Sequence, residues 1–350
     1  MAEERKPGFE LACPVPSDGA GRITMAHGGG GRMTERLVEE VFMPAFGGAE
    51  LGRKHDGAYL NMTGRMAVTT DSFVVSPLFF PGGSLGSLAV HGTVNDLAMC
   101  GARPAAVTAG FILEEGLEVG VLRRVAAEMA EAARQAGVEI VAADTKVVER
   151  GKGDGVYINT TGIGECQVGE TGPWRVEPGD AVIVSGDLGR HGTAILSVRE
   201  GLQFEAPIES DSAILWPAVE ALIQAGIDIH CMRDLTRGGL SSALNEIAKA
   251  RGVEVMIRER QIPVMDAVRG ACEFLGLDPL YVANEGRFCV FVPASEAARV
   301  VGILQEIGVS AGASCIGHAS PGAARVVMET RIGGRRVVDM LSGEQLPRIC

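Results

Sequence analysis

The chain alternates strand-like and helix-like segments twice, and this double alternation restricts the fold more than any other feature of the sequence. In the first half, apolar runs of strand length and amphipathic runs of helix length follow one another: strands at 66–75, 104–113, 139–148 and 156–165, helices at 84–102 and 121–137. A similar order of patterns resumes at Ala181. Between the halves, VGETGPWRVEPGD (168–180) contains Gly, Pro and charge but no periodicity, which is typical of a linker. The sequence therefore predicts two α/β domains.

The predicted boundaries follow from these patterns. We place the N-terminal domain at 23–168, a linker at 169–180 and the C-terminal domain at 181–340, with a flexible segment at 1–22 and a mobile tail at 341–350. A chain of 350 residues is long enough for two hydrophobic cores of ordinary size. Within the second domain, the pattern predicts a helix over SAILWPAVEALIQAG (212–226), a strand over IDIHCM (227–232) and two late strands.

Composition excludes several classes of protein. The formal net charge of −12 disfavours a nucleic-acid partner, because binding a phosphate backbone needs a basic face. No apolar run reaches the length of a membrane span, and the first 20 residues do not resemble a signal peptide. The eight cysteines include no C-x-x-C pair, which favours free thiols in a reducing cytoplasm.

Five aspartates follow apolar strands or lie at tight turns: Asp56, Asp71, Asp96, Asp144 and Asp234. Strand ends at one edge of a sheet converge, and several carboxylates held together repel one another unless a cation lies between them. Mg²⁺ prefers carboxylate, water and phosphate oxygens, so such a cluster is a common way to hold a nucleoside triphosphate on an acidic protein. Each aspartate could instead cap a helix or a turn.

Other polar residues suit phosphate binding or proton transfer. Lys146 lies two residues after Asp144, so in a strand both side chains leave on the same face and could grip a phosphate, or form a surface ion pair. The glycine runs, including RGGL (237–240), allow backbone N–H groups to approach phosphate, although no Walker motif is present. Glu285 precedes Gly286 and an apolar strand, where it could act as a base at a cleft or lie in a solvated turn.

The chain ends LPRIC, with Cys350 as its last residue. We expect this thiol to be exposed on a short, stiffened tail that could reach a cleft on its own protein or a partner's. The adjacent α-carboxylate should raise the pKa of the thiol, which argues against a self-activated nucleophile and for an acceptor that needs help from outside.

Taken together, TTDSFVV, GTVNDLAMCGARP, ADTKVV, RDLTRGGL, NEGRFCVF and the terminal PRIC resemble the HypE family of hydrogenase-maturation proteins, from about residue 23 to the end. That family is similar to the aminoimidazole ribonucleotide synthetase and selenophosphate synthetase superfamily. The resemblance implies a two-domain PurM-like α/β (α+β) fold, with an N-terminal domain that dimerises through its sheet, a C-terminal α+β domain and an ATP site between them.

The resemblance also implies a reaction. Cys350 would receive a carbamoyl group from the carbamoyltransferase HypF, and ATP would activate the carboxamide oxygen so that its loss leaves a protein thiocyanate. The cyanide would then pass to iron on the HypC–HypD scaffold, for the metal centre of [NiFe]-hydrogenase. The protein would therefore be a cytoplasmic, homodimeric, ATP-dependent carbamoyl dehydratase that acts on its own terminal cysteine.

The motifs then assign roles to residues. The metal positions would be Asp56, Asp71, Asp96 and Asp234. The nucleotide would be bound by Asp71, Asn95, Asp96, Asp144, Thr145, Lys146, Gly238 and Gly239. The catalytic residues would be Cys350, Glu285 as the base, Lys146 and His91.

Two other interpretations of the function remain open on the sequence alone. One is a superfamily relative that phosphorylates a free small molecule, such as a selenophosphate synthetase or a thiamine phosphate kinase, although such enzymes do not need a terminal PRIC. The other is a non-catalytic metal or redox adaptor that uses the terminal thiol. The adaptor reading predicts that Asp96→Asn is silent, whereas the dehydratase reading predicts that it abolishes function.

Overall fold

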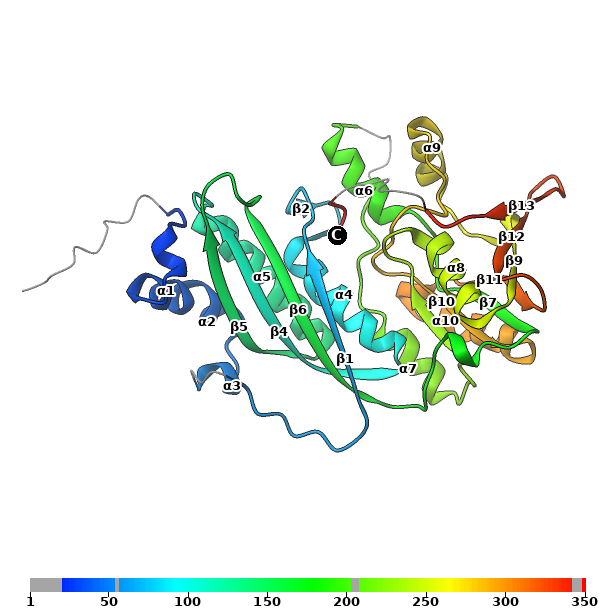
Figure 1. The fold of residues 1–350 in the computed structure, drawn as a ribbon, viewed down its shortest axis with the longest axis horizontal. Helices are drawn as coiled ribbons and strands as arrows, with labels where there is room; N and C mark the ends of the chain where they lie inside the picture. The colour runs from blue at the N-terminus through cyan, green and yellow to red at the C-terminus, as the bar shows by residue number, and fades with distance from the viewer. Residues whose placement is uncertain (1–20, 54–56, 203–207, 342–347) are drawn as a thin grey trace, which may run out of the picture.

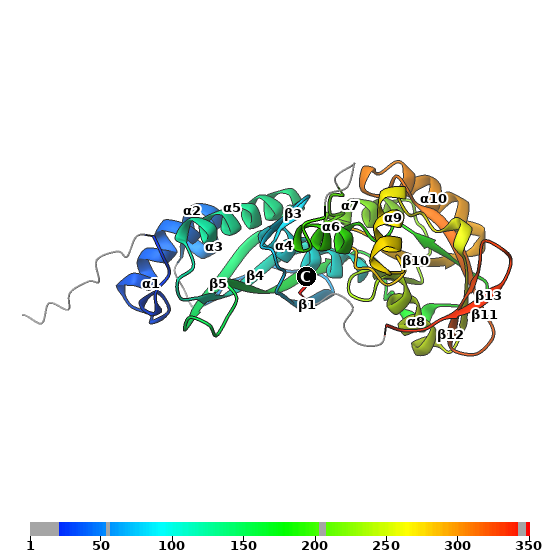
Figure 2. The same ribbon diagram turned by 90° about the horizontal axis from the view of Figure 1, so that it is seen from above.

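The computed structural model describes residues 21–53, 57–202, 208–341 and 348–350, and it has two α/β domains that lie side by side along the long axis (Figures 1 and 2). In these ranges no helix has the length and apolar character needed to cross a bilayer. The first domain holds β1 to β6 and the second holds β7 to β13.

The first domain is a four-stranded sheet with helices on one face. Its strands lie in the order β1 (Met66–Phe73), β6 (Val156–Cys166), β4 (Ala102–Glu114) and β5 (Glu139–Val148). Only β4 and β5 are parallel. Helices α4 (Leu85–Met99) and α5 (Val119–Ala136) cover one face, and the opposite face has no helix among the described residues (Figure 2). That uncovered face exposes Met66, Val68 and Ile112 by 44%, 65% and 45%.

Smaller elements complete the first domain. The helical segments η1 (Met25–Gly28), α1 (Arg32–Leu37), η2 (Val38–Phe42), α2 (Met43–Phe46) and α3 (Ala49–Gly52) gather at the β5 end of the sheet, and β2 (Phe79–Phe80) and β3 (Gly83–Ser84) form a small ribbon before α4 (Figure 1).

Helix α4 belongs to the first domain and packs against the second. It begins at Ser84, whose Oγ accepts a hydrogen bond from the Ser87 N–H at 3.3 Å, and its chain turns away at Gly101 with φ of 65°. Nearly every residue of α4 is buried, because the sheet and α5 pack on one side and the second domain on the other. A helix that is apolar all round is expected in such a position.

The second domain is a seven-stranded sheet with helices on both faces. The strand order is β13 (Arg335–Val338), β12 (Arg325–Glu329), β9 (Glu254–Arg258), β11 (Ser314–Ser320), β7 (Asp180–Val184), β10 (Phe288–Pro293) and β8 (Cys231–Asp234). One core forms under α8 (Gly239–Arg251), and another under α7 (Trp216–Gln224) and α10 (Ala297–Gln305). Helices α6 (Arg190–Arg199) and α9 (Asp266–Leu275) pack together at the side (Figure 1). Short 3₁₀ turns lie at η3 (Pro173–Arg175), η4 (Glu259–Gln261), η5 (Ala294–Glu296) and η6 (Gly308–Ser310).

The structure corrects three sequence-based elements in this domain. Three late strands follow α10, not two. The strand predicted at 227–232 is β8, and it begins only at Cys231. The helix predicted over 212–226 starts at Trp216, with Pro217 in its first turn, where proline favours a helix start. Residues 208–215 before it form no helix, and their polar groups bind the neighbouring segments instead.

Candidate active site

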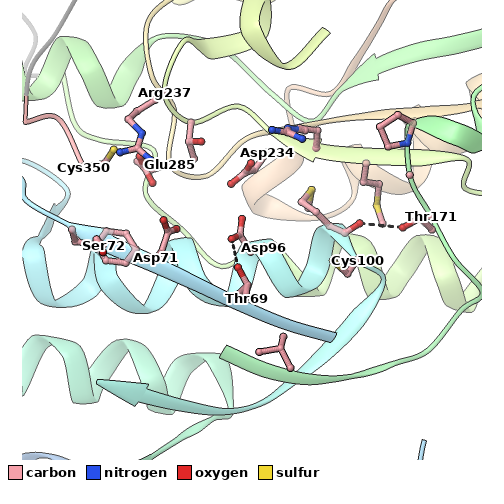
Figure 3. Close-up of a pocket in the computed structure, with 18 of the residues that line it drawn as sticks. Thr69, Asp71, Ser72, Asp96, Cys100, Thr171, Asp234, Arg237, Glu285 and Cys350 are labelled. Atoms are coloured by element: carbon pink, nitrogen blue, oxygen red, sulfur yellow. Dashed lines mark hydrogen bonds between the residues drawn. The ribbon is translucent and has the colours of Figure 1, made fainter. Parts of the chain in front are cut away.

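A pocket of about 420 Å³ opens between the two domains (Figure 3). Strand β1 contributes Asp71, α4 contributes Asp96 and β8 contributes Asp234. Glu285 and the C-terminal Cys350 line the same pocket. Three strands or helices from both domains therefore deliver carboxylates to one place, as the positions of these aspartates in the sequence predict.

The three aspartates disturb one another's ionisation. Burial and the neighbouring Asp96 raise the pKa of Asp71 to about 6. Burial, followed by Asp96, raises the pKa of Asp234 to about 7, while Arg233 opposes the shift. The pKa of Asp96 is raised by burial, although Thr69 donates a hydrogen bond to it at 2.6 Å. Carboxylates that repel in this way favour the arrival of a cation.

The cluster is nevertheless looser than a ready-made metal cage. Among the described residues, no three His, Cys, Asp or Glu side chains are close enough together to hold a metal ion by themselves. Mg²⁺ usually keeps several waters and binds through one or two carboxylates together with substrate phosphates. Asp71, Asp96 and Asp234 thus suit a metal that arrives with a nucleotide. Asp56, the fourth predicted metal position, lies outside the described residues.

Glu285 and Cys350 lie beside each other at one end of this pocket (Figure 3). Glu285 is 3% exposed, and its pKa is raised well above the usual range by burial first and then by the charges of Asp234, Asp211 and Asp71. Its Oε1 atom is buried and has no hydrogen-bond partner in the part of the chain that the structure describes. Glu285 was predicted as a base, and its raised pKa favours the protonated form in this state.

The terminal thiol is buried, which contradicts the expected exposure. Cys350 is 9% exposed and Ile349 is 3% exposed within the core of the first domain. The pKa of the Cys350 thiol is raised, as predicted, but burial is the main cause and Glu285 comes next, not the terminal carboxylate. A thiol with a raised pKa is a poor nucleophile, so the docked tail protects it.

The tail is docked by specific contacts. The Val74 N–H donates to a terminal carboxylate oxygen of Cys350 at 3.1 Å, and the Ser76 N–H donates to the Arg348 carbonyl at 3.2 Å, so the end of the tail lies beside the segment that follows β1. His191 Nε2 bonds the Ile349 carbonyl at 2.8 Å. Burial of one Ile side chain contributes about 1.5–3 kcal/mol and each hydrogen bond about 1 kcal/mol, before the entropy of ordering the tail is subtracted. The entropy of ordering the chain offsets part of this gain, so the docked end can still be released.

Asp144 and Lys146 lie away from this pocket. Both are on β5, at the opposite edge of the sheet from β1, and three strand spacings separate the edges by roughly 14 Å. They also face the other way. Asp144 pairs across Gly110 with Asn159, whereas Asp71 pairs with Thr160, the next residue, so the two aspartates point to opposite faces.

The pair occupies the uncovered face. Lys146 Nζ lies 3.0 Å from Asp144 Oδ2, and the two side chains are 66% and 73% exposed. Thr145, between them, points to the covered face and is buried. The predicted shared face of Asp144 and Lys146 is confirmed, but within one chain they do not join Asp71, Asp96 and Asp234.

Asn95 is engaged by the protein itself. Its amide donates to the Ala213 carbonyl at 2.9 Å and to the Glu285 carbonyl at 3.4 Å, and its Oδ1 accepts from the Leu215 N–H at 2.8 Å. The side chain that was predicted to bind nucleotide therefore fastens α4 to the second domain.

Gly238 and Gly239 are required by the backbone. They have φ of 80° and 58° at the start of α8, and a Cβ on Gly239 would lie 2.6 Å from the Leu280 carbonyl oxygen. These constraints explain the glycines without a nucleotide.

His91 is buried on α4. Its Nδ1 lies 3.0 Å from the Ser212 hydroxyl, while Nε2 has no partner among the described residues. Burial lowers its pKa to about 4, so the ring is neutral.

The structure adds residues that the sequence reasoning did not single out. Arg237 reaches into the pocket beside Glu285 and Cys350, and Thr69 supports Asp96 (Figure 3). Arg237 is the first residue of the RGGL run, in which only the glycines were predicted to bind phosphate. Asp211 and His191 had no motif that could reveal them, because their roles depend on contacts between distant segments.

Comparison with known proteins shows to which family the chain belongs. The family models for the N-terminal and C-terminal domains of AIR synthase related protein match residues 54–166 and 177–328. Carbamoyl dehydratase HypE of Azotobacter vinelandii is 52% identical over 333 residues, which cover 94% of this chain and 98% of that protein. The chain belongs to the HypE family.

Solved HypE structures agree with this membership. The crystal structure of hydrogenase maturation protein HypE in complex with ATP is similar with a TM-score of 0.91 and 49% identity, and covers 93% of this chain and 99% of that one. HypE in a HypE–HypF complex is similar with a TM-score of 0.77 and 45% identity, and covers 87% of this chain and 99% of that one. The predicted family and the two-domain PurM-like fold are confirmed.

Proposed function

We propose that this HypE is the carbamoyl dehydratase of hydrogenase maturation, which uses ATP to convert an S-carbamoyl group on its own Cys350 into a thiocyanate. The observation that most supports this proposal is the docking of the terminal thiol beside Glu285, in a pocket that also holds three aspartates. Relatives of about half identity have the name carbamoyl dehydratase, and a similar structure contains ATP.

The overall chemistry balances without a redox partner. The carboxamide R–S–C(=O)–NH₂ has a poor leaving group on carbon, and transfer of a phosphoryl group to its oxygen supplies a good one. Phosphate then departs with that oxygen as two protons leave the nitrogen, and R–S–C≡N remains. The pocket must therefore hold a triphosphate next to the sulfur, stabilise charge on the transferred phosphoryl group and accept protons.

Each part of the pocket suits one of these tasks. We assign Asp71, Asp96 and Asp234 to Mg²⁺, which would neutralise the phosphate charge when bound with ATP. Arg237 is placed to stabilise the oxygen that becomes phosphate. Positive charge near the aspartates would lower the pKa of Glu285, because two of those charges help to raise it, and Glu285 could then accept a carboxamide proton.

His91 remains a proposed catalytic residue, because its ring is neutral and its Nε2 bonds none of the described residues. Gly238 and Gly239 stay as proposed nucleotide contacts through the turn that carries Arg237.

Asp144 and Lys146 are proposed to act from a second subunit, whereas the Thr145 side chain is buried on the covered face, so only its backbone could take part in the proposed nucleotide contact. The uncovered face of the first sheet exposes Met66, Val68 and Ile112, which a second copy could bury. In the homodimer that we propose, the two uncovered faces pack together, and the β5 edge of each chain lies at the β1 edge of its partner. Lys146 would then reach the pocket of the other subunit.

A cysteine that carries a one-carbon group needs one partner that loads the group and another that accepts it. HypF would load the carbamoyl group, as a similar HypE is found in complex with HypF. The HypC–HypD scaffold would accept the cyanide. The seven described cysteines are all free, in keeping with a reducing cytoplasm.

The experiment combines the purified protein with HypF, carbamoyl phosphate, Mg²⁺ and ATP, and measures the mass of the C-terminal peptide. We expect a carbamoyl adduct on Cys350 that loses one water in an ATP-dependent step. An Asp96→Asn variant should accumulate the carbamoyl adduct. An adaptor would show no ATP-dependent adduct, and a kinase for free small molecules would leave Cys350 unmodified.

A further inference from the structure

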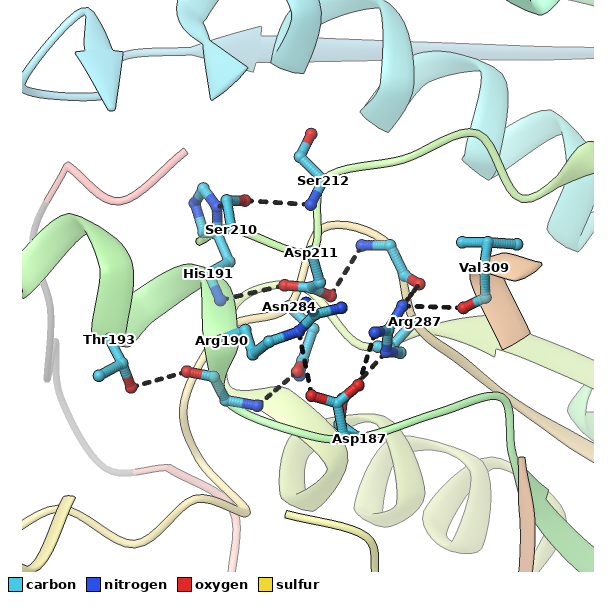
Figure 4. Close-up of polar contacts among 12 residues, drawn as sticks. Asp187, Arg190, His191, Thr193, Ser210, Asp211, Ser212, Asn284, Arg287 and Val309 are labelled. Carbon is cyan, nitrogen blue, oxygen red and sulfur yellow. Dashed lines mark hydrogen bonds and ion pairs between the residues drawn. The ribbon is translucent and has the colours of Figure 1, made fainter. Parts of the chain in front are cut away.

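Asp211 lies between two features of the proposed site, Glu285 and the anchor of the tail. Asp211 is 4% exposed, in the 208–215 segment, which contacts the first domain where the Ser210 N–H donates to the Pro81 carbonyl at 2.8 Å. Its Oδ2 accepts hydrogen bonds from the backbone N–H groups of Glu285 and Gly286, at 3.3 and 3.1 Å. Its Oδ1 accepts from the His191 N–H at 3.0 Å (Figure 4). One buried carboxylate therefore fixes both features.

The backbone at Glu285 is held tightly from both sides. A Cβ on Gly286 would lie 1.9 Å from the Asp211 carbonyl oxygen, so only glycine allows this approach. On the other side, Arg287 Nη2 lies 2.6 Å from Asp187 Oδ1, and Arg287 Nη1 donates to the Val309 carbonyl at 3.1 Å (Figure 4). Glu285 has little freedom to move unless Asp211 releases it.

The hydrogen bonds around His191 determine its tautomer. The Ile349 carbonyl can only accept, so His191 Nε2 must carry the proton that it donates at 2.8 Å. The ring is fully buried, and burial lowers its pKa, so it is neutral and Nδ1 must accept. Ser210 Oγ, at 2.8 Å, is therefore the donor to Nδ1, and it accepts from the Ser212 N–H at 3.0 Å. The 208–215 segment thus orients the ring that binds the tail.

We propose that Asp211 is a positioning residue that couples docking of the Cys350 tail to the placement of Glu285. Asp211 makes no contact with the thiol and acts through His191 and the Glu285 backbone. An asparagine keeps only one acceptor oxygen, so it can serve either the His191 N–H or the N–H groups of Glu285 and Gly286, but not both, and the link between the tail anchor and Glu285 is broken. The proposal rests on the proposed dehydratase function only for its kinetic part.

The test compares two buried aspartates, Asp211→Asn and Asp180→Asn. Asp180 is a matched control because it is 3% exposed and also accepts a backbone hydrogen bond, from the Glu177 N–H at 2.8 Å, but lies away from the tail. The first measurement is the rate at which iodoacetamide alkylates Cys350, followed by the mass of the C-terminal peptide. This rate needs no turnover, so it stands even if dehydration is never observed.

Asp211→Asn should speed alkylation of Cys350 about tenfold and slow single-turnover dehydration of the carbamoylated protein by about 10- to 100-fold, because small misplacements of reacting groups are costly. The KM for ATP should change by less than about twofold, since Asp211 does not line the pocket. Asp180→Asn should change neither rate.

If Asp211→Asn does not fold, Ser210→Ala provides a second variant. It removes the donor to His191 Nδ1, frees the ring to take the other tautomer and should speed alkylation of Cys350 severalfold. The proposal is overturned if both variants alkylate at the wild-type rate, or if Asp211→Asn and Asp180→Asn alter alkylation and turnover equally. Failure of the wild type to dehydrate its adduct, with alkylation as expected, would overturn the proposed function and leave the coupling intact.

Discussion

The two faces of the first sheet have opposite chemistry. The covered face directs Asp71 into a half-buried pocket, where burial and neighbouring carboxylates raise pKa values and the terminal thiol is enclosed. The uncovered face presents Asp144 and Lys146 to solvent among exposed apolar side chains. The chain therefore separates residues that one phosphoryl-transfer site would need together. We infer that one subunit alone holds only part of the proposed site. The predictions below test whether the two faces have these separate roles.

The largest effect is expected on the covered face. Asp234→Asn removes a carboxylate proposed for the metal, and we expect dehydration of the carbamoylated protein to fall by about 100- to 1000-fold, the usual loss when a main electrostatic partner is removed. Loading by HypF should be unchanged, which the mass of the C-terminal peptide will show. A variant that dehydrates at the wild-type rate would remove Asp234 from the site.

The second prediction concerns Lys146 across the subunit boundary. Lys146→Ala and Glu285→Gln should each be nearly inactive, but a mixture refolded together should recover about a quarter of the wild-type activity, because half of the dimers are mixed and each has one intact site. Activity is measured by phosphate release from carbamoylated protein. A mixture that stays inactive would place Lys146 in the site of its own subunit, and a Lys146→Ala variant with wild-type activity would place Lys146 outside the reaction.

The third prediction tests the uncovered face itself. Ile112→Glu places a charge on the proposed dimer contact, and we expect a monomer in size-exclusion chromatography with light scattering. Ile332→Glu is the control, since Ile332 is 95% exposed on the hairpin between β12 and β13 and should leave the dimer intact. If both variants are dimers, or both are monomers, the result would argue against dimerisation through this face.

The smallest effect is a pH dependence that belongs to the covered face. Folding raises the pKa of Asp71 to about 6 and that of Asp234 to about 7, so the folded protein binds more protons than the unfolded chain between about pH 4 and 7. This cluster therefore stabilises the metal-free protein less as pH rises through that window. Mg²⁺ with ATP should raise the Tm more at about pH 8 than at about pH 5.

Two variants assign this pH dependence. Asp96→Asn should flatten the dependence of the Tm on pH, because Asp96 raises both pKa values, while Asp144→Asn on the other face should not change it. A dependence that survives Asp96→Asn would have another source.

Much of the fold was predictable from the sequence because the first domain follows simple periodicity. The strand and helix patterns from 66 to 165 correspond to β1, α4, β4, α5, β5 and β6. The sequence also placed Asp71, Asp96 and Asp234 together, since they end strands or lie on the helix between them. The resemblance of the motifs to HypE predicted the family, which the comparisons confirm.

The missed features depend on contacts between distant segments. Residues 213–215 have apolar character that suits a helix, but Asn95 and the Glu285 carbonyl bind the backbone of Ala213 and Leu215 and hold this segment outside the helix. The tail was expected to be free because nothing local buries Cys350, and only the fold brings His191 and Val74 to it. Asp144 and Lys146 were predicted to lie beside the metal. The spacing of two residues in a strand predicts that they share a face, but it does not predict which of the two faces of the sheet that is.

The most direct test follows the oxygen that must leave. Cys350 is carbamoylated with a carboxamide that contains a heavy oxygen isotope, Mg²⁺ and ATP are added in ordinary water, and the released phosphate is analysed by mass spectrometry in a single turnover. The account predicts that the heavy oxygen appears in inorganic phosphate, with one label for each thiocyanate formed on Cys350. Thiocyanate formed while the label appears in water, or ATP hydrolysed to unlabelled phosphate, would contradict it.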